Sequence, residues 1–143
     1  MTKQEDRIRA VARAYRPRGW KVREHDPWNG CAGEANPATR TITCPPLTRP
    51  YALFVYLHEV GHIRCGHFQT TDLPTWRQEY EAETWAIEAM RASGFRVTDE
   101  MLAYARLNVE RHILREWHRN RHQAHDLDID VEVLKFAFPE TWR

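Results

Sequence analysis

The amino-acid sequence predicts an α+β fold: a mainly helical domain with a small two- or three-stranded sheet next to a central helix. Residues 52–57 are continuously apolar, as in a buried helix, and they lead directly into the pattern H-E-x-x-H at residues 58–62. Short segments rich in β-forming residues precede this helix at 20–25 and 39–44, and other segments have helical periodicity. Because 143 residues suffice for one hydrophobic core, we predict a single domain over residues 1–143.

The segments before the central helix are predicted to be one helix and two strands. Apolar side chains recur on one stripe of residues 3–15, which indicates an amphipathic helix. Apolar and polar residues alternate from Trp20 to His25, which indicates a strand that leads into a turn at 26–30. Thr39–Cys44 is the second β-rich run. An exposed strand there could hold an extended peptide along Thr39–Cys44, or the strands could form a purely structural hairpin, and the sequence leaves both possibilities open.

The central helix is expected within Tyr51–His67. Thr48 is its expected N-cap, and Pro50 suits the first turn because proline has no N–H to leave unpaired there. Gly66 is the expected stop, since glycine readily takes the left-handed conformation that ends many helices.

Two more helices are predicted after the central one. The first covers Pro74–Ser93 and ends before Gly94, and the second is a long helix that Thr98 or Asp99 caps and that runs to about residue 122. Both carry an apolar stripe at helical spacing.

The end of the chain differs from the rest in its charge. It is rich in aspartate and glutamate, and residues 131–138 could form a strand or a docked arm. We therefore place the core of the domain at about residues 5–95 and assign the long helix and an acidic C-terminal arm to 98–143.

Composition excludes several classes of protein. Hydrophobic residues make up 42% and charged residues 29% of the chain, which is ordinary for a globular domain, and the net charge of +1 favours neither nucleic-acid nor membrane binding. The sequence has no recognisable signal peptide and no apolar run of transmembrane length. Three cysteines without a tight spacing favour a reducing compartment, so we expect a cytoplasmic protein.

The H-E-x-x-H pattern carries the candidate chemistry. Residues four apart lie on one face of a helix, so His58 and His62 can offer two imidazole nitrogens to one metal ion. Glu59 can then polarise a water on that metal and take its proton. Gly61 lowers helix propensity, but it leaves room for another element to pass close to the metal. His67 lies five residues past His62, so we expect it to point away from the metal and to have an outer or structural role.

The helix after the motif offers four glutamates as a third ligand. At about 100° per residue, Glu79 and Glu83 fall in the middle of its apolar arc, whereas Glu81 and Glu88 fall near the opposite side and look solvated. Two carboxylates on a buried face are costly unless they are paired or bound to a metal. We therefore predict Glu79 as the third ligand and Glu83 as an acceptor that orients one ligand histidine through its free N–H. The alternative is an ordinary charged helix in a different register.

Together, H-E-V-G-H-I at residues 58–63 and E-Y-E-A-E-T-W-A at residues 79–86 resemble the ImmA/IrrE family of metallopeptidases. Members of that family look like H-E-x-G-H followed by E-x-E-A-(N/D)-x-F-A, so Glu83 stands where Asn or Asp is usual and Trp85 stands in place of Phe. The resemblance covers roughly residues 5–95. It implies a zinc-dependent endopeptidase with a gluzincin-like core. Members of the family are encoded in mobile elements or stress-response loci, and they cleave helix-turn-helix repressors and so relieve repression.

The function predicted from these residues is that of a zinc endopeptidase with one zinc ion per chain. His58, His62 and Glu79 would hold the zinc, and Glu59 would be the general base for the attacking water. The substrate would be a protein, and the resemblance implies a DNA-binding repressor. Because this chain has no obvious helix-turn-helix and little net charge, the DNA-binding partner would be a separate protein and direct nucleic-acid binding is not expected.

The alternative is a non-catalytic protein-binding module that keeps the site as a structural zinc centre. The presence of Glu59 argues against it, because a purely structural site has no use for a base at that position. Three residues are candidates for stabilising the oxyanion of a peptidase reaction: Tyr80, Tyr104 and His112.

Overall fold

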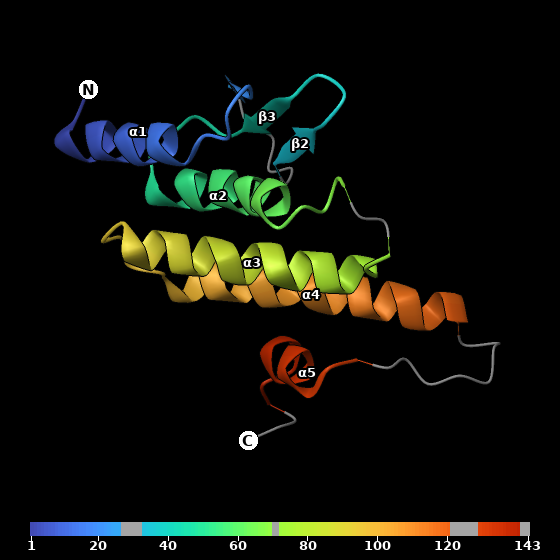
Figure 1. Cartoon of the computed structure of the whole chain (residues 1–143). Helices are drawn as coiled ribbons and strands as arrows, with labels where there is room; N and C mark the ends of the chain where they lie inside the picture. The colour runs from blue at the N-terminus through green and yellow to red at the C-terminus, as the bar shows by residue number, and fades with distance from the viewer. Residues whose placement is uncertain (27–32, 70–71, 121–128, 141–143) are drawn as a thin grey trace.

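The computed structural model describes residues 1–26, 33–69, 72–120 and 129–140. Within these ranges the elements are, in chain order, α1 (Lys3–Tyr15), β1 (Lys21–Glu24), β2 (Glu34–Asn36), β3 (Thr41–Cys44), α2 (Pro50–Arg64), α3 (Thr75–Ala92), α4 (Asp99–Asn120) and α5 (Val131–Ala137) (Figure 1). The protein is a mainly helical α+β fold with a small sheet, as the sequence predicts. Among the described helices, none combines the length and the apolar character needed to cross a membrane.

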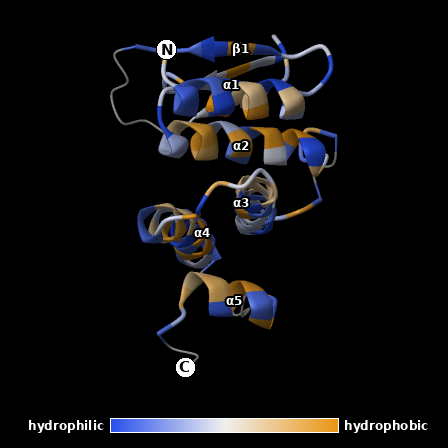
Figure 2. Ribbon diagram, turned by 90° about the vertical axis from the view of Figure 1, so that its left-hand side faces the viewer, coloured by the Kyte–Doolittle hydropathy of each residue, from blue (hydrophilic) through white to orange (hydrophobic). Residues whose placement is uncertain are grey.

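Helix α2 lies at the centre of the molecule. The sheet and α1 lie on one side of it and α3 on the other, while α4 lies beside α3 and α5 lies farthest from the sheet (Figures 1 and 2). Every residue from Ala52 to Gly61 is buried, so this part of α2 has no solvent-facing side. The apolar run at 52–57 is therefore the buried helix that the sequence predicts.

The first turn of α2 begins one residue later than expected. Pro50 occupies the first helical position, which places the N-cap at Arg49 rather than at Thr48. The expectation of a Thr48 cap is thus wrong, and Arg49 makes no capping hydrogen bond through its side chain.

The other end of α2 closes in a Schellman motif. Gly66 has a φ of 73°, the left-handed conformation that the sequence analysis expects of a stop residue. The N–H of Gly66 donates to the carbonyl oxygen of Ile63 at 3.1 Å, and the N–H of His67 donates to that of His62 at 3.0 Å. The chain therefore turns back on itself, and His67 returns to the end of α2 that carries His62.

Helices α2 and α3 cross at backbone contact. A Cβ added to Gly61 would lie 2.9 Å from the carbonyl oxygen of Ala82, closer than real Cβ atoms approach, and 3.1 Å from the Cα of Ala82. Glycine is thus required at this crossing, as the sequence analysis expects from Gly61. Because the two backbones touch here, side chains one turn away on either helix reach each other.

The three strands form one mixed sheet in the order β1–β3–β2. β1 pairs with β3 in parallel, with Val22 opposite Ile42, and β2 pairs with β3 in antiparallel, with Ala35 opposite Ile42. β3 is therefore the central strand of the described sheet, and its backbone is paired on both sides. The expectation that an extended peptide lies along Thr39–Cys44 is wrong, because that strand has no free edge. Most of the turn expected at 26–30 lies outside the described residues.

The later helices lie close to their predicted positions. α3 ends before Gly94, which has a φ of 79°. Thr98 caps α4, since its Oγ1 accepts a hydrogen bond from the N–H of Met101 at 3.2 Å. The start that the sequence predicts for the long helix is therefore confirmed, and the predicted end at about residue 122 lies outside the described residues.

The described part of the C-terminal arm is a helix, so the possibility of a strand over 131–138 is wrong. Val133 and Ala137, one turn apart on α5, are buried. They form a second hydrophobic cluster with Trp76 at the start of α3 and with Val109 and Ile113 of α4. This cluster is separate from the main core, which α2 shares with α1, the sheet, α3 and the first half of α4.

Candidate metal centre

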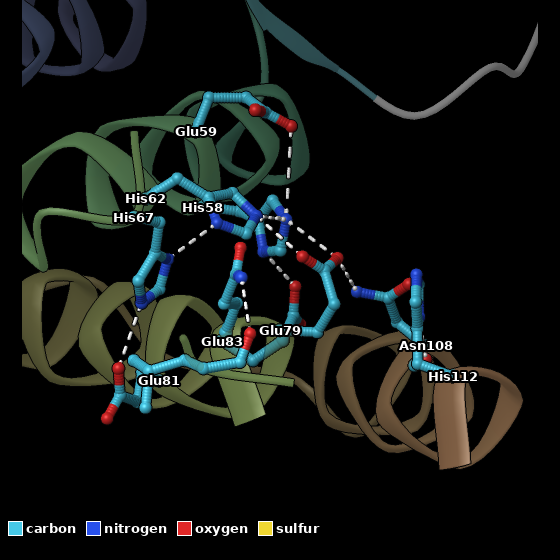
Figure 3. A network of polar contacts seen from close by, with 11 residues as sticks. His58, Glu59, His62, His67, Glu79, Glu81, Glu83, Asn108 and His112 are labelled. Atoms are coloured by element: carbon cyan, nitrogen blue, oxygen red, sulfur yellow. Dashed lines mark hydrogen bonds and ion pairs between the residues drawn. The ribbon is translucent and has the colours of Figure 1, made fainter. Parts of the chain in front are cut away.

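Three predicted ligands meet at the crossing of α2 and α3. Nε2 of His58 lies 3.1 Å from Nε2 of His62, and Oε2 of Glu79 lies 2.7 Å from Nε2 of His62 (Figure 3). Oε1 of Glu79 lies 3.5 Å from Nε2 of His58. The close approach of the helices at Gly61 explains the meeting, because it sets one turn of α3 against the turn of α2 that carries both histidines.

The geometry and chemistry of these three residues fit a zinc ion. A tetrahedral Zn²⁺ with ligands at about 2.0–2.1 Å keeps its ligand atoms about 3.3 Å apart, and one atom from each residue lies within 4.8 Å of the other two. Neutral imidazole nitrogens and a carboxylate oxygen are all electron-pair donors, so they approach this closely only around shared protons or a cation. Two histidines and one glutamate are also a common protein ligand set for catalytic zinc.

Glu83 holds the ring of His58 in place from behind. The Glu83 side chain is completely buried, and its Oε1 contacts Nδ1 of His58. In a neutral His58 ring the proton is therefore on Nδ1, which leaves the lone pair of Nε2, on the side of Glu79, available to a metal. Glu83 occupies the outer position that the sequence analysis predicts for it, and it acts on His58 rather than on His62.

Buried charges shift the protonation of the centre. Burial alone would lower the pKa of His58, but the adjacent carboxylates of Glu83 and Glu79 outweigh it and raise this pKa well above the usual histidine range. Burial alone would raise the pKa of Glu79, but hydrogen bonds from His58 and His62 outweigh it and hold this pKa well below the usual range. His58 and Glu79 thus form a charged pair that a bound cation would reorganise.

Asn108 of α4 orients the third ligand, a role that the sequence analysis missed. Its Nδ2 donates a hydrogen bond to Oε1 of Glu79 at 2.8 Å (Figure 3). Asn108 lies next to Val109 and three residues after Ala105, both on the buried face of α4. The sequence shows Asn108 as a single amide at the border of an apolar stripe, which could have suggested a buried polar contact. It does not show which buried group the amide would contact.

Glu59 lies beside the three ligands without being one of them. Its side chain is buried, and its Oε1 lies 3.9 Å from Nε2 of His58. In Figure 3 it reaches the His58 ring from α2, whereas Glu79 and Glu83 reach the centre from α3. Burial raises the pKa of Glu59, although the two histidines partly counteract this effect. A carboxylate with a raised pKa next to a ligand cluster is suited to accept and return a proton.

The backbone just before β2 forms a wall against Glu59. A Cβ added to Gly33 would lie 3.1 Å from Cγ of Glu59 and 3.0 Å from Cγ1 of Val55. Since β2 begins at Glu34 and is an edge strand of the described sheet, this edge strand starts next to a residue that contacts Cγ of Glu59. The sequence offers no local signal for this contact, because β2 has only three residues.

Glu81 differs from its predicted environment. The helical phase predicts a solvated side chain, but only 28% of the Glu81 side chain is exposed. Its Oε1 lies 2.9 Å from Nε2 of His67, and its Oε2 accepts a hydrogen bond from Nε of Arg77 at 3.2 Å. The helical phase correctly turns Glu81 away from the ligand cluster, but the Schellman turn places His67 over it. His67 itself is buried and lies outside the ligand set, as expected.

The three oxyanion candidates occupy different places. Tyr80 packs edge-on against Phe136 of α5, with ring centroids 5.4 Å apart, and so belongs to the second cluster. Burial raises the pKa of Tyr104 to about 12, with a further contribution from the charge of Glu83. His112 lies one turn after Asn108, and its Nδ1 donates to the carbonyl oxygen of Asn108 at 2.8 Å. The charge of Glu83 thus reaches Tyr104, and His112 contacts the backbone of Asn108, whereas Tyr80 serves the packing of α5.

Comparison of this chain with protein-family models, with curated proteins and with solved structures finds no significant match.

Proposed function

We propose that this protein is a zinc-dependent peptidase that cleaves a protein chain internally. The observation that carries the proposal is the placement of Glu59, a buried carboxylate 3.9 Å from Nε2 of His58 that is not itself in the set His58, His62 and Glu79. Catalytic zinc sites have three protein ligands and leave one position for water, whereas structural sites are closed by four. Within the described residues, the ligand set has three members.

The residues of the centre would have different roles in a hydrolysis. Zinc bound there would polarise the scissile carbonyl and lower the pKa of the attacking water. Glu59 would take the proton of that water and pass it to the leaving amine, which is the work for which its position and raised pKa suit it. Glu83 and Asn108 would keep His58 and Glu79 in the orientation that binding requires.

The substrate would lie on the outer edge of β2. An extended peptide can add to an exposed sheet edge through main-chain hydrogen bonds, and β2 is the edge strand whose start lies against Glu59. A peptide on this edge would pair with the strand that starts one residue after Gly33, which contacts the proposed base. β3, by contrast, is paired on both sides and leaves the peptide no partner.

The resemblance to the ImmA/IrrE family is the basis for the substrate and the biological role that we propose. By that resemblance, the substrate is a helix-turn-helix repressor encoded near this gene, and cleavage in the cytoplasm relieves repression. The rival function is a protein-binding module with a structural zinc site. A structural role needs the ligands and their outer partners, but it does not need Glu59.

The substitution Glu59→Gln tests the proposal and its rival together. It removes the base and keeps the shape of the side chain, so zinc content should stay at the wild-type level while cleavage falls by about 10²–10⁴-fold. The measurement is zinc content by mass spectrometry, followed by cleavage of repressors encoded near the gene, read as defined fragments on a gel.

Glu88→Gln is the matched control, because Glu88 is an exposed glutamate on α3, and it should cleave like the wild type. A zinc-loaded wild type that cleaves none of the repressors or unrelated proteins would favour the structural module. Cleavage of unrelated proteins alone would remove the repressor as substrate and keep the peptidase.

A further inference from the structure

The turn that ends α2 brings a third histidine against the ligand pair. In the Schellman motif at Gly66, an apolar contact often forms between the returning residue and the last turn of the helix. Here the contact joins two ring nitrogens instead, because Nδ1 of His67 lies 2.8 Å from Nδ1 of His62 (Figure 3). His67 is 6% exposed, so this contact is made away from water.

The surroundings decide which ring carries the proton between these two nitrogens. Nε2 of His67 lies 2.9 Å from Oε1 of Glu81, and an ionised carboxylate can only accept. The neutral His67 ring therefore carries its proton on Nε2, and its Nδ1 has a lone pair. In the neutral His62 ring that would bind zinc, the proton between the two rings then belongs to Nδ1 of His62. This tautomer leaves the lone pair of Nε2 of His62, which lies beside Glu79, for the metal.

Glu81 is held in turn from its other side. Its Oε2 accepts from Nε of Arg77 at 3.2 Å, and Nη1 of Arg77 contacts Asp130 and, at 3.4 Å, Glu132 at the start of α5. The ordered chain His62–His67–Glu81–Arg77 therefore joins the candidate centre on α2 to α3 and α5. Its inner bond is buried, and its outer ion pairs are at the surface, where each contributes little by itself.

We propose that His67 is a positioning residue for the metal centre: it fixes the tautomer and ring orientation of His62, and Glu81 fixes the tautomer of His67. The inference rests on the proposed zinc centre and extends it. His58 and His62 are then oriented by different means, the first by the carboxylate of Glu83 directly and the second by a carboxylate acting through another histidine. Such outer partners typically contribute about 10–100-fold to metal affinity.

A comparison of two substitutions separates positioning from packing. His67→Phe keeps a ring of similar size in the buried site but has no nitrogen to accept from His62, whereas His67→Gln keeps an amide oxygen that can accept. Zinc affinity, measured by competition with a chromogenic chelator, should fall by about 10–100-fold in the Phe variant and recover most of that loss in the Gln variant. Equal affinity of wild type and His67→Phe would overturn the inference, as would equal losses in the Phe and Gln variants.

The tautomers themselves can be observed by nitrogen-15 NMR of the histidine rings in the zinc-loaded wild type. We expect His62 to carry its proton on Nδ1 and His67 to carry its proton on Nε2. A His67 ring with its proton on Nδ1 would overturn the inference whatever the affinities are. This readout depends on the hydrogen-bond direction and does not respond to a purely structural role.

Glu81→Ala keeps the inference testable if the buried His67 variants fail to fold, because Glu81 is partly exposed. It should weaken zinc binding by about tenfold, at the low end of the range for outer partners, whereas Glu88→Ala on the exposed side of α3 should leave the affinity unchanged. Equal affinities of these two variants would overturn the role of Glu81. A wild type that binds no zinc would overturn the proposed function and this inference together, whereas zinc binding insensitive to His67 and Glu81 would overturn the inference alone.

Discussion

Two of the places where α3 meets another part of the molecule are built in different ways. At the crossing with α2, backbone touches backbone, since a Cβ on Gly61 would lie 2.9 Å from the carbonyl oxygen of Ala82. At its N-terminal end α3 meets α4 and α5 through side chains, in the small apolar cluster that includes Trp76 and Val133, with ion pairs from Arg77 at the surface. The first contact tolerates no added atom, whereas the second can adjust by rotating side chains.

This difference matches the distribution of the candidate chemistry. The ligand atoms lie at the crossing, where a small shift of either helix would separate them, and outer partners hold them there. The second cluster contributes no ligand, and Arg77 is its link to the centre through Glu81. The candidate ligands thus lie at the rigid contact, and the packing that can adjust lies at the other contact. A binding site needs its ligands on rigid elements, so this arrangement suits one.

Gly61→Val should break the crossing and have the largest effect. Valine is a better helix former than glycine, but its side chain would collide with the backbone of Ala82, which cannot rotate away. We expect destabilisation at the upper end of the ~1–3 kcal/mol of an overpacked core, together with loss of zinc binding because α3 is displaced. Thermal unfolding and zinc content measure the two effects.

A valine introduced at an exposed helical position is the control for Gly61→Val. Ala103→Val on α4 should alter the free energy of unfolding by less than about 0.5 kcal/mol and leave zinc bound. Wild-type zinc content in a folded Gly61→Val variant would mean that the close approach of the helices does not hold the ligands together.

A matched pair of valines sharpens the comparison between the two regions. Val60 of α2 and Val133 of α5 are both completely buried, so Val→Ala at either should cost roughly 1–3 kcal/mol of unfolding free energy. Val60→Ala should also weaken zinc binding, because the cavity opens between Glu59 and Gly61. Val133→Ala should leave the zinc affinity within about twofold of wild type. Equal changes in zinc affinity would show that the second cluster positions the centre as strongly as the crossing does.

The crossing was largely predictable from the sequence, for physical reasons. A continuously apolar run is a buried helix or strand, and the two histidines of H-E-x-x-H share one face only on a helix. The local sequence pattern therefore predicts α2. Helical phase then separates Glu79 and Glu83 from Glu81. Helical phase does not reveal the chain reversal after Gly66, which brings His67 over Glu81. Because of this reversal, Glu81, which looks solvated in the sequence, contacts His67.

The sheet and α5 were less predictable, because tertiary contacts decide them. Local sequence indicates β1 and β3, but strand order is a property of the whole fold, and the central place of β3 depends on the three-residue strand β2. In α5, Val131 and Val133 alternate with polar residues as in a strand. The helix forms because Val133 and Ala137, one turn apart, together cover Trp76.

Protonation offers the finest test of the comparison, because the candidate ligands with strongly shifted pKa values lie at the crossing. The pKa of His58 is raised well above the usual range near 6.5 by the carboxylates of Glu83 and Glu79. The sign follows directly: this group stabilises the zinc-free fold below pH 6.5, and the contribution is lost as the pH rises through the raised pKa. Zinc requires the neutral ring, so its binding at pH 7 should release about one proton from His58, and its apparent affinity should rise with pH.

Calorimetry of zinc binding in two buffers of different ionisation enthalpy measures that proton directly. Glu83→Gln removes the nearest negative charge, which lowers the pKa of His58 and should reduce the number of protons released at pH 7. Glu132→Gln, at the start of α5, is the control from the other region, and it should release as many protons as the wild type. If both variants release the same number of protons, the charge that raises the pKa of His58 does not come from Glu83. The contact between Glu83 and Nδ1 of His58 would then not be what sets the protonation of this ring before metal binds.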